Sequence, residues 1–503
     1  MKHQKQKQQN DELQPPEYFD EHILRNWFVN CDDVIIQTNQ FGAAGSSVQA
    51  VFIYCSGMTE TKIINDVILP ELHKVFKETG FQRRETMNHN ADLQWDVLYS
   101  PNLKTTRSTI SSYVFEGHLL FCLPNIQTIW TIDIANFPSR MPSESATEVS
   151  IRGPKDGFVE QLTTNIALIR KRLRTYTLAC EYTQLGERTL TKTALLYVSD
   201  IANPEMIKEV KDKLTNIHVE KLVTTGHLED LLSGSPIVLF PPTHYTGRPD
   251  FAVECLLNGR FIIFVDGNPT AIIAPSNLFL LMKSPEDAYF PFLSVNVGRI
   301  LRFFGFITTI FLPGFYISLT AFHIDQVPFP LLATITSGRH GLPMESGLEM
   351  FFIMVMMELF REAGVRLPSS IGQTLTVVGG LIIGDAAIRA GLISPLMIVV
   401  TAITVVSGAT LVNQSLTSSM ILVRFASFTL AATFGMYGFI TSIILFVIYL
   451  STVTSFGVPY LAPAAPLDFK EMLKSLFKWP FMMNRRRPEY LHTQDPSKTG
   501  KKR

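Results

Sequence analysis

The sequence has few charged residues for its length: 17% of the side chains are Asp, Glu, Lys or Arg, whereas 46% are hydrophobic. Positive and negative charges balance to a formal net charge of zero, which gives no general attraction to nucleic acid. The five cysteines are well separated and form no Cys-x-x-Cys pair, which argues against a zinc site or a disulfide framework. They lie in or beside apolar runs, so we expect buried free thiols in a reducing compartment.

The chain also lacks a recognisable catalytic or metal-binding constellation. His118, His227 and His244 have no ligand spacing to one another, and no Ser/His/Asp, Cys/His or paired-carboxylate arrangement can be picked out. The glycines of residues 151–159 could form a phosphate loop before a helix, but the Gly-Lys-Ser/Thr ending of a P-loop is missing. An ordinary turn with a helix cap is favoured there. We therefore predict a protein that is not an enzyme and that uses no cofactor or metal.

A polar region with alternating strand and helix patterns makes up more than half of the chain. Residues 1–30 are rich in Gln, Lys and Asn and contain no apolar stretch typical of a secretory signal, so we predict a disordered start and a cytosolic head. The prolines and Ser/Glu-rich stretch after residue 137 indicate a boundary between two α/β subdomains, residues 31–140 and 151–290, without a visible internal repeat. Predicted strands include Val48–Cys55, Leu93–Leu98, Gly117–Leu123, Thr128–Ile134, Thr177–Tyr182, Thr193–Val198, Ile237–Phe240 and Arg260–Val265. Predicted helices include Glu60–Lys77, Asp156–Arg174 and one opened by Asn203-Pro204.

A charge-poor region, residues 299–467, predicts a helical transmembrane domain. Phe303–Phe322 carries no charge and is long enough to cross the ~30 Å hydrocarbon core. Arg299 and Arg302 precede it and mark its cytoplasmic side. Further candidate spans are Leu367–Gly384, Gly391–Val412 and Phe425–Leu450.

The number of spans stays open between four and six. The last residues are strongly basic and are expected inside, which requires an even number. Six spans would need the short apolar segment Glu345–Arg361 to cross and Phe425–Leu467 to divide into two. Four spans would instead leave Arg339, Arg361, Arg366 and Arg424 outside.

Residues 468–503 predict an amphipathic helix followed by a basic cytosolic tail. Phe469 and its apolar neighbours fall on one helical face, with lysines on the other. We expect this helix to lie on an anionic membrane surface, with a soluble helix packed against the head as the alternative. The expected membrane-surface residues are Lys470, Lys474, Lys478 and Trp479.

The second candidate span, Leu367–Gly384, has the sequence pattern that most suggests a function. Its glycines recur at intervals near four, which lets helices approach closely: Gly372, Gly380, Gly384 and Gly391. If several copies meet around an axis, the opposite face would line a pore with Asp385 near its mouth. The alternative is packing inside one chain, with Asp385 and Arg389 as a helical ion pair. Candidate pore-lining residues are Thr374, Val377, Val378, Leu381 and Asp385.

Several motifs in order along the chain resemble the A subunits of the GerA family of spore germinant receptors. The most specific is Arg361–Pro368 (REAGVRLP). In the head the matching segments are Gly153–Glu160, Thr164–Arg170, Arg248–Asp250, Val265–Pro269 and Ser284–Asp287. In the membrane block they are Phe315–Leu319, Pro330–Leu332, Gly372–Gln373, Ile383–Ala387, Ala390–Pro395 and Ser455–Tyr460.

The resemblance implies a non-enzymatic subunit of a nutrient sensor in the spore inner membrane, a multi-pass protein with a cytosolic head. It implies assembly with a permease-like B subunit, which binds the nutrient, and a C-subunit lipoprotein. It further implies a homo-oligomer, a pentamer, that conducts monovalent cations. The family commonly has Gln where this chain has Asp385, so the resemblance does not make that carboxylate an obligatory selectivity group.

Two other functions remain in view. A secondary transporter of the nutrient would be expected to have two related halves with unwound helices, and no such repeat is visible in the spans. A non-conducting scaffold would tolerate polar or bulky substitutions along 374–381, where a channel would leak or jam.

Overall fold

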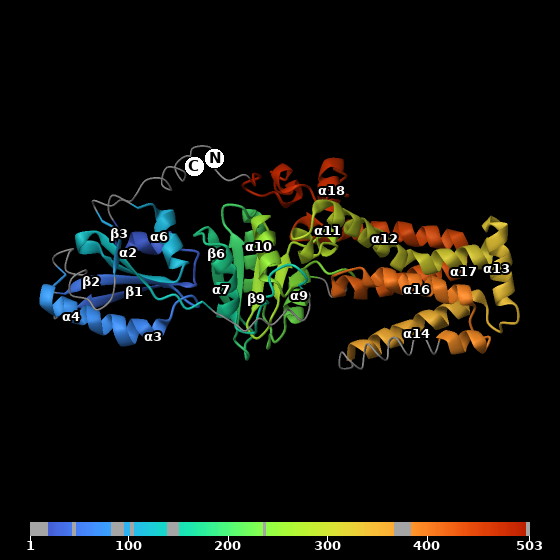
Figure 1. The fold of residues 1–503 in the computed structure, drawn as a ribbon, viewed down its shortest axis with the longest axis horizontal. Helices are drawn as coiled ribbons and strands as arrows, with labels where there is room; N and C mark the ends of the chain where they lie inside the picture. The colour runs from blue at the N-terminus through green and yellow to red at the C-terminus, as the bar shows by residue number, and fades with distance from the viewer. Residues whose placement is uncertain are drawn as a thin grey trace. The chain divides into compact units, whose positions relative to one another are not determined.

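The computed structural model describes residues 19–42, 47–81, 95–100, 105–137, 150–234, 238–366 and 384–498. These residues form two compact units. Unit 1 is the head, up to residue 236 together with 243–275 and the tail from Arg485. Unit 2 contains residues 237–242 and 276–484 and holds the long helices (Figure 1).

Subdomain 1 of the head is an antiparallel sheet with helices on both faces. The strands are β1 (Val34–Phe41), β2 (Val48–Cys55), β3 (Asp96–Tyr99), β4 (His118–Leu123) and β5 (Thr128–Asp133), in the order β1-β2-β4-β5-β3. Side chains alternate across the strands, so Val51 and Leu120 face one core while Phe52 and Phe121 face the other. Helices α2 (Glu21–Trp27) and α6 (Arg107–Val114) cover the first face. The helical stretch α3 (Thr61–Ile63), η1 (Ile64–Ile68) and α4 (Leu69–Thr79) covers the second.

Subdomain 2 repeats this topology. Its strands are β6 (Leu178–Leu185), β7 (Thr191–Val198), β8 (His244–Thr246), β9 (Phe261–Val265) and β10 (Ala271–Ala274), in the order β6-β7-β9-β10-β8. Its helices are α7 (Leu162–Arg172), α8 (Pro204–Thr215), α9 (Thr225–Ser233) and α10 (Pro249–Leu257). Strand order and helix positions therefore match those of subdomain 1, a duplication that the sequence pattern did not reveal.

Most of the predicted head elements lie near the predicted ranges, with three corrections. Residues 21–27, inside the start predicted to be disordered, form α2, because Leu24 packs into the core of subdomain 1. Leu239 and Phe240 are not in a strand; Phe240 is buried in the core of unit 2 among aromatic rings. Helix α7 begins at Leu162 rather than Asp156, because the preceding motif forms a loop and the Asp266 carboxylate accepts a hydrogen bond from the Leu162 N–H at 3.1 Å. All five cysteines are buried and none forms a disulfide, as expected.

A buried ion pair joins the two subdomains. Both Asp33, before β1, and Arg170, in α7, have fully buried side chains. The guanidinium donates two hydrogen bonds, from Nε to Oδ2 at 2.7 Å and from Nη2 to Oδ1 at 2.8 Å, and lies over the ring of Phe115. Burial alone would lower the pKa of Arg170, but the Asp33 carboxylate outweighs it and raises that pKa. The same burial raises the pKa of the neighbouring Cys55 thiol.

The tail, residues 485–498, docks on subdomain 2. Gln494 donates its backbone N–H to the Ile201 carbonyl at 3.0 Å and its side-chain amide to Ala202 at 2.8 Å, just after β7. The Arg487 guanidinium donates to the Leu257 carbonyl at 2.7 Å at the end of α10. The tail is thus held by its backbone and by a buried arginine rather than standing free in solvent.

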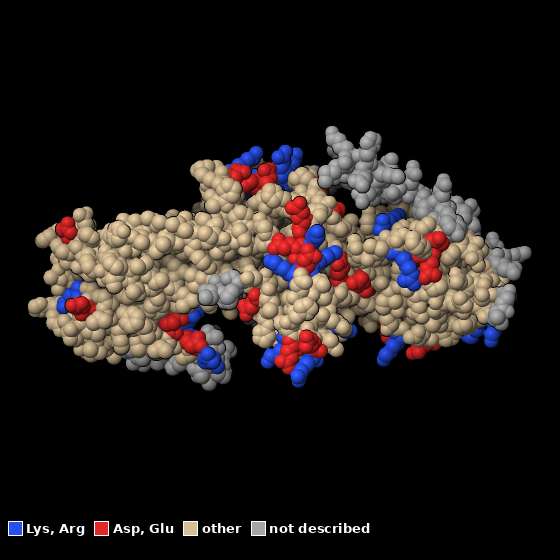
Figure 2. All heavy atoms as spheres, turned by 180° about the vertical axis from the view of Figure 1, so that it is seen from behind, with Lys and Arg blue, Asp and Glu red and all other residues tan. Residues whose placement is uncertain are grey.

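Unit 2 is a bundle of long apolar helices. Its main elements are α11 (Leu278–Leu281), η3 (Pro285–Ala288), α12 (Phe292–Ile317) continued by η4 (Ser318–Phe322), η5 (Ile324–Gln326), α13 (Phe329–Arg339), α14 (Ser346–Arg366), α16 (Pro395–Ala409), α17 (Gln414–Thr452) and α18 (Phe469–Leu476). On the face in Figure 2 the surface over the long helices is almost free of charged side chains. Among the described residues, two helices, Phe292–Phe322 and Gln414–Thr452, are long and apolar enough to cross a membrane. Short segments complete the described structure: η2 (Pro124–Ile126), β11 (Thr454–Ser455), β12 (Val458–Pro459), η6 (Phe481–Met483) and η7 (Glu489–Leu491).

Helix α17 is a hairpin folded at Gly435. This glycine has φ 62° and ψ −140°, which a helix cannot contain. The hydroxyls of Ser427 and Ser442, on either side of it, share a hydrogen bond of 2.8 Å. Leu416 and Leu450, near the two ends, lie in one core cluster, so the two arms run antiparallel.

Candidate functional site in the helical bundle

Small residues mark where the described helices approach closely. A Cβ added to Gly305 would meet Thr410 at 2.5 Å, and one added to Gly408 would meet Thr309 at 3.3 Å, so α12 and α16 pack through glycine. A Cβ on Gly314 would meet Ala431 of α17 at 3.3 Å. These are the contacts that small residues permit between helices.

Two of the four glycines predicted to pack, Gly384 and Gly391, lie in the part of the chain that is described. A Cβ added to Gly384 or Gly391 would meet nothing within 4 Å. Among the described residues, these two glycines therefore make no close helix contact. The other predicted packing and pore residues fall outside the described residues: Gly372, Gly380, Thr374, Val377, Val378 and Leu381.

Asp385 lies on a short helical turn, residues 384–389, at the surface of unit 2. Its carboxylate forms an ion pair with Arg389, four residues on, at 2.8 Å. The two side chains are 57% and 79% exposed, so the pair is solvated and contributes little stability. The helical ion pair of the alternative reading is present, but it is not packed inside the bundle.

A buried charged contact joins α14 to α17. The Arg424 guanidinium, 7% exposed, donates to Glu358 Oε2 at 3.2 Å, and Arg361 pairs with Glu358 Oε1 at 2.5 Å. Glu358 thus shares its two oxygens between arginines from two helices. Removal of Glu358 would leave the buried Arg424 charge without this partner, which is costly. Glu358, in the short segment 345–361, therefore pairs with Arg361 and Arg424, two of the arginines that left the number of spans open.

A second buried carboxylate links α14 to α16. Glu349 is fully buried and its Oε1 accepts a hydrogen bond from the backbone N–H of Ser394 at 2.5 Å. Ser394 is the N-cap of α16, so the carboxylate lies at the positive end of that helix. Two of the three glutamates of α14, Glu349 and Glu358, thus contact other helices of the bundle.

A polar cluster surrounds the start of α12. Asp287, in the turn before the helix, forms ion pairs with Arg299 at 2.9 Å and with Arg302 at 2.5 Å. All three side chains are nearly buried. The arginines that the sequence placed at a membrane entrance are thus turned inward to a carboxylate of their own unit.

The predicted membrane-surface lysines of α18 have different surroundings. Lys470 is exposed, whereas Lys474 pairs with Glu471 at 2.5 Å. Lys478 donates to the carbonyls of Asp287, Ala288 and Phe290 at 2.7–3.1 Å. Lys478 is therefore bound to its own unit, while Trp479 remains 40% exposed.

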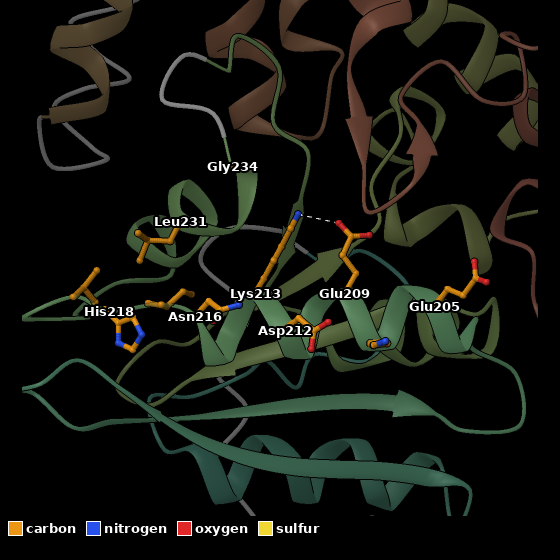
Figure 3. A pocket seen from close by; sticks show the side chains of 11 residues that line it. Glu205, Glu209, Asp212, Lys213, Asn216, His218, Leu231 and Gly234 are labelled. Carbon is orange, nitrogen blue, oxygen red and sulfur yellow. Dashed lines mark ion pairs between the residues drawn. The ribbon is translucent and has the colours of Figure 1, made fainter.

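The head has an open groove between α8 and α9, with a volume of about 660 Å³ (Figure 3). Charged residues of α8 line its floor, among them Glu205, Glu209 and Lys213. Lys213 pairs with Glu209 at 3.0 Å and donates to the Leu232 carbonyl at 3.3 Å. Much of the charge in the groove is thus used within the protein. No group of three His, Cys, Asp or Glu side chains that could hold a metal occurs in the part of the chain that is described.

The sequence model described as "Bacillus/Clostridium GerA spore germination protein" matches residues 22–490. The chain is 42% identical to spore germination protein XA of Bacillus anthracis over 94% of its own length and 96% of that protein. It is 32% identical to spore germination protein KA of Bacillus subtilis (strain 168), over 93% of this chain and 85% of that protein. It also matches the N-terminal domain of the A subunit of the Bacillus megaterium spore germinant receptor GerK3, with 23% identity, TM-score 0.37, and 52% of this chain and 96% of that chain covered. The match of the family model over almost the whole chain and the identity to these relatives show that the chain belongs to the GerA family of spore germination proteins.

Proposed function

We propose that this chain is the A subunit of a nutrient-gated cation channel, in which several copies surround a pore lined by the span 367–384. The observation that carries the proposal is the open space at Gly384 together with the exposure of Asp385, at the end of that span. A small residue with open space above it lets a neighbouring helix approach. Among the described residues the close helix contacts use other glycines, so we assign Gly384 to a contact with another copy.

The proposed membrane topology has six passes. Helix α12 runs from Gly305, near Thr410, to Phe322, near Gly435, so α16 and the second arm of α17 run opposite to it. Met350 packs near Ile317, and the ~16 residues from there to the end of α14 rise ~24 Å toward the other end of the bundle. Ala387 packs in the cluster of Met350. The span 367–383 would then cross back between them as the third pass.

The even number of passes also follows from the chain's two ends. Residues 243–275, ahead of α12, and the tail from Arg485 belong to one compact unit, so we place both on the same side of a membrane. We assign that side to the cytosol and the membrane to the spore's inner membrane. The nutrient is bound by a permease-like B subunit, with a C-subunit lipoprotein as the third partner and a pentamer as the assembly.

Cation flux from proteoliposomes that contain the receptor with its B and C subunits tests the proposal. Val377→Ala and Val378→Ala should leak potassium without nutrient, because shorter side chains widen the apolar constriction and let water fill it more easily. The matched control is Val406→Ala on α16, whose side chain is 66% exposed and which should keep flux dependent on nutrient.

The other outcomes are equally informative. Nutrient-dependent flux that is unchanged in both variants would move the pore away from this span. Cation flux absent from every form, with the complex intact, would favour the scaffold. Uptake of labelled nutrient into the vesicles would favour the transporter.

A further inference from the structure

We infer that α18 is an in-plane membrane anchor: its apolar face inserts at the boundary between the headgroups and acyl chains of the phospholipid layer into which α12 enters. The inference rests on the proposed membrane location of unit 2, but not on conduction. The proposed lipid-binding surface belongs to α18, which is not part of the proposed pore.

The orientation of α18 is the first support. Its polar residues Glu471 and Ser475 are turned inward and are 4% and 8% exposed. Its apolar residues Phe469 and Leu473 point outward and are 65% and 42% exposed. A soluble amphipathic helix buries its apolar face, and this helix presents that face to its surroundings. The outward face is therefore matched to lipid.

The apolar surface continues on both sides of the helix. Leu467 before it is 62% exposed, and Trp479 and Met482 after it are 40% and 81% exposed. Trp is the residue that prefers the interface between water and hydrocarbon. A patch of this kind in solution would favour aggregation, whereas a headgroup layer accommodates it.

The height of α18 along the bundle is fixed by hydrogen bonds to α12. The Asn296 amide donates to the Lys478 carbonyl at 3.1 Å and accepts from the Lys478 N–H at 2.6 Å. The Lys478 ammonium holds the three carbonyls at the end of η3. Asn296 lies in the second turn of α12, ~10 Å before the uncharged stretch from Phe303, which places it next to the polar layer of ~5–8 Å that borders the hydrocarbon core.

The surface of α12 at this level agrees with the assignment. Leu293, Val297 and Leu301 are 68%, 59% and 60% exposed, while the arginines between them turn inward to Asp287. In Figure 1, α18 runs across the direction of the long helices rather than along it. A helix that crosses the spanning direction at the entrance of a span lies in the plane of the membrane.

Fluorescence quenching by brominated phospholipid tests the anchor. The full chain would be reconstituted in phosphatidylcholine vesicles with and without phosphatidylglycerol, and with dibrominated acyl chains. The chain has four tryptophans, and the other three lie in the head, so we expect roughly a quarter of the emission to be lost in the wild type and little in Trp479→Phe. Equal quenching in the two proteins would overturn the inference.

Two further variants separate insertion from a protein contact. Leu473→Gln should reduce the quenching of Trp479 by about half or more, whereas Ser475→Ala, on the inward face, should leave it unchanged. Lys470→Gln should remove the added quenching that phosphatidylglycerol gives, and Lys62→Gln in the head is its control. Retained quenching in Leu473→Gln would contradict insertion of this face. Because flux is measured separately, a non-conducting chain with a quenched Trp479 would leave the anchor intact and refute only the channel.

Discussion

Asp33 and Arg170 illustrate how a single buried pair can hold a large part of the head together. Neither side chain reaches solvent, and their two hydrogen bonds use both carboxylate oxygens. We predict that Asp33→Asn lowers the free energy of unfolding by about 3–5 kcal/mol, because it leaves the guanidinium charge buried without a counter-ion. Denaturant titration of the purified chain, followed by tryptophan fluorescence of the head, measures the change.

The matched control is the exposed ion pair between Arg174 and Glu116, which also joins the two subdomains. Its side chains are 46% and 37% exposed. Arg174→Met should change stability by about 0.5 kcal/mol or less, because exposed pairs contribute little. Comparable losses in the free energy of unfolding for the two variants would mean that burial is not the reason why the Asp33–Arg170 pair stabilises the head.

At the level of elements, Gly435 determines that α17 folds back. Its backbone angles are reached without strain only by glycine, and an added Cβ would lie 2.9 Å from the Phe322 ring. Gly435→Ala should therefore lower the thermal midpoint of the detergent-purified chain by several degrees, for a cost of about 2 kcal/mol or more. The thermal unfolding curve is the measurement.

Gly341→Ala is the control for Gly435. Gly341 also has positive φ, 86°, but open space around its Cα, so only the backbone cost of about 1 kcal/mol applies. If both variants lose the same stability, the contact with Phe322 is unimportant and the hairpin depends on backbone angle alone.

Element types in the head could be predicted well from sequence because alternation and turn residues are local signals. β2 spans Val48–Cys55, and Asn203-Pro204 caps and opens α8, as predicted. The strand predicted at Leu239–Phe240 was wrong because a short apolar run fits a strand and a buried loop equally well. Here the run is a loop that contacts Tyr449. The duplicated topology was missed because strand order depends on pairings between distant segments, which leave no period in the sequence.

The bundle was harder to predict because its charged residues have partners that sequence spacing does not show. Glu358 and Arg424 are far apart along the chain yet form an ion pair, so the charges that argued against a span at 345–361 are compensated inside the protein. Likewise, Lys478 belongs to the lysine face of α18 by spacing but binds carbonyls of a turn nearly two hundred residues earlier. The Gly-rich span was identified by pattern alone, and its proposed role stays a prediction.

For the whole molecule, the six-pass topology predicts which loops lie on which side of the membrane. The loop with Gln326, after α12, should lie opposite the tail with Asp495. In sealed spheroplasts, Gln326→Cys should react with a membrane-impermeant maleimide, whereas Asp495→Cys should react only after lysis. The five native cysteines are buried, which keeps the background low.

Labelling of both positions from outside would contradict the assignment of the tail to the cytosol. Labelling of neither before lysis would indicate that the loop after α12 does not emerge on the far side. Either result would change the number of passes while leaving the helices described here in place.

The docked tail covers a surface of subdomain 2 that corresponds to the contact surface of subdomain 1. Subdomain 1 meets subdomain 2 at two places. The first lies just after β2, where a Cβ added to Gly57 would be 3.0 Å from the Thr163 carbonyl. The second lies between α6 and β4, where Glu116 pairs with Arg174. The tail covers the corresponding places on subdomain 2, after β7 and between α10 and β9. Like modules stacked end to end leave one such surface uncovered on the last module. Residues 485–498 therefore cover, on subdomain 2, the surface that corresponds to the one by which subdomain 1 meets its neighbour.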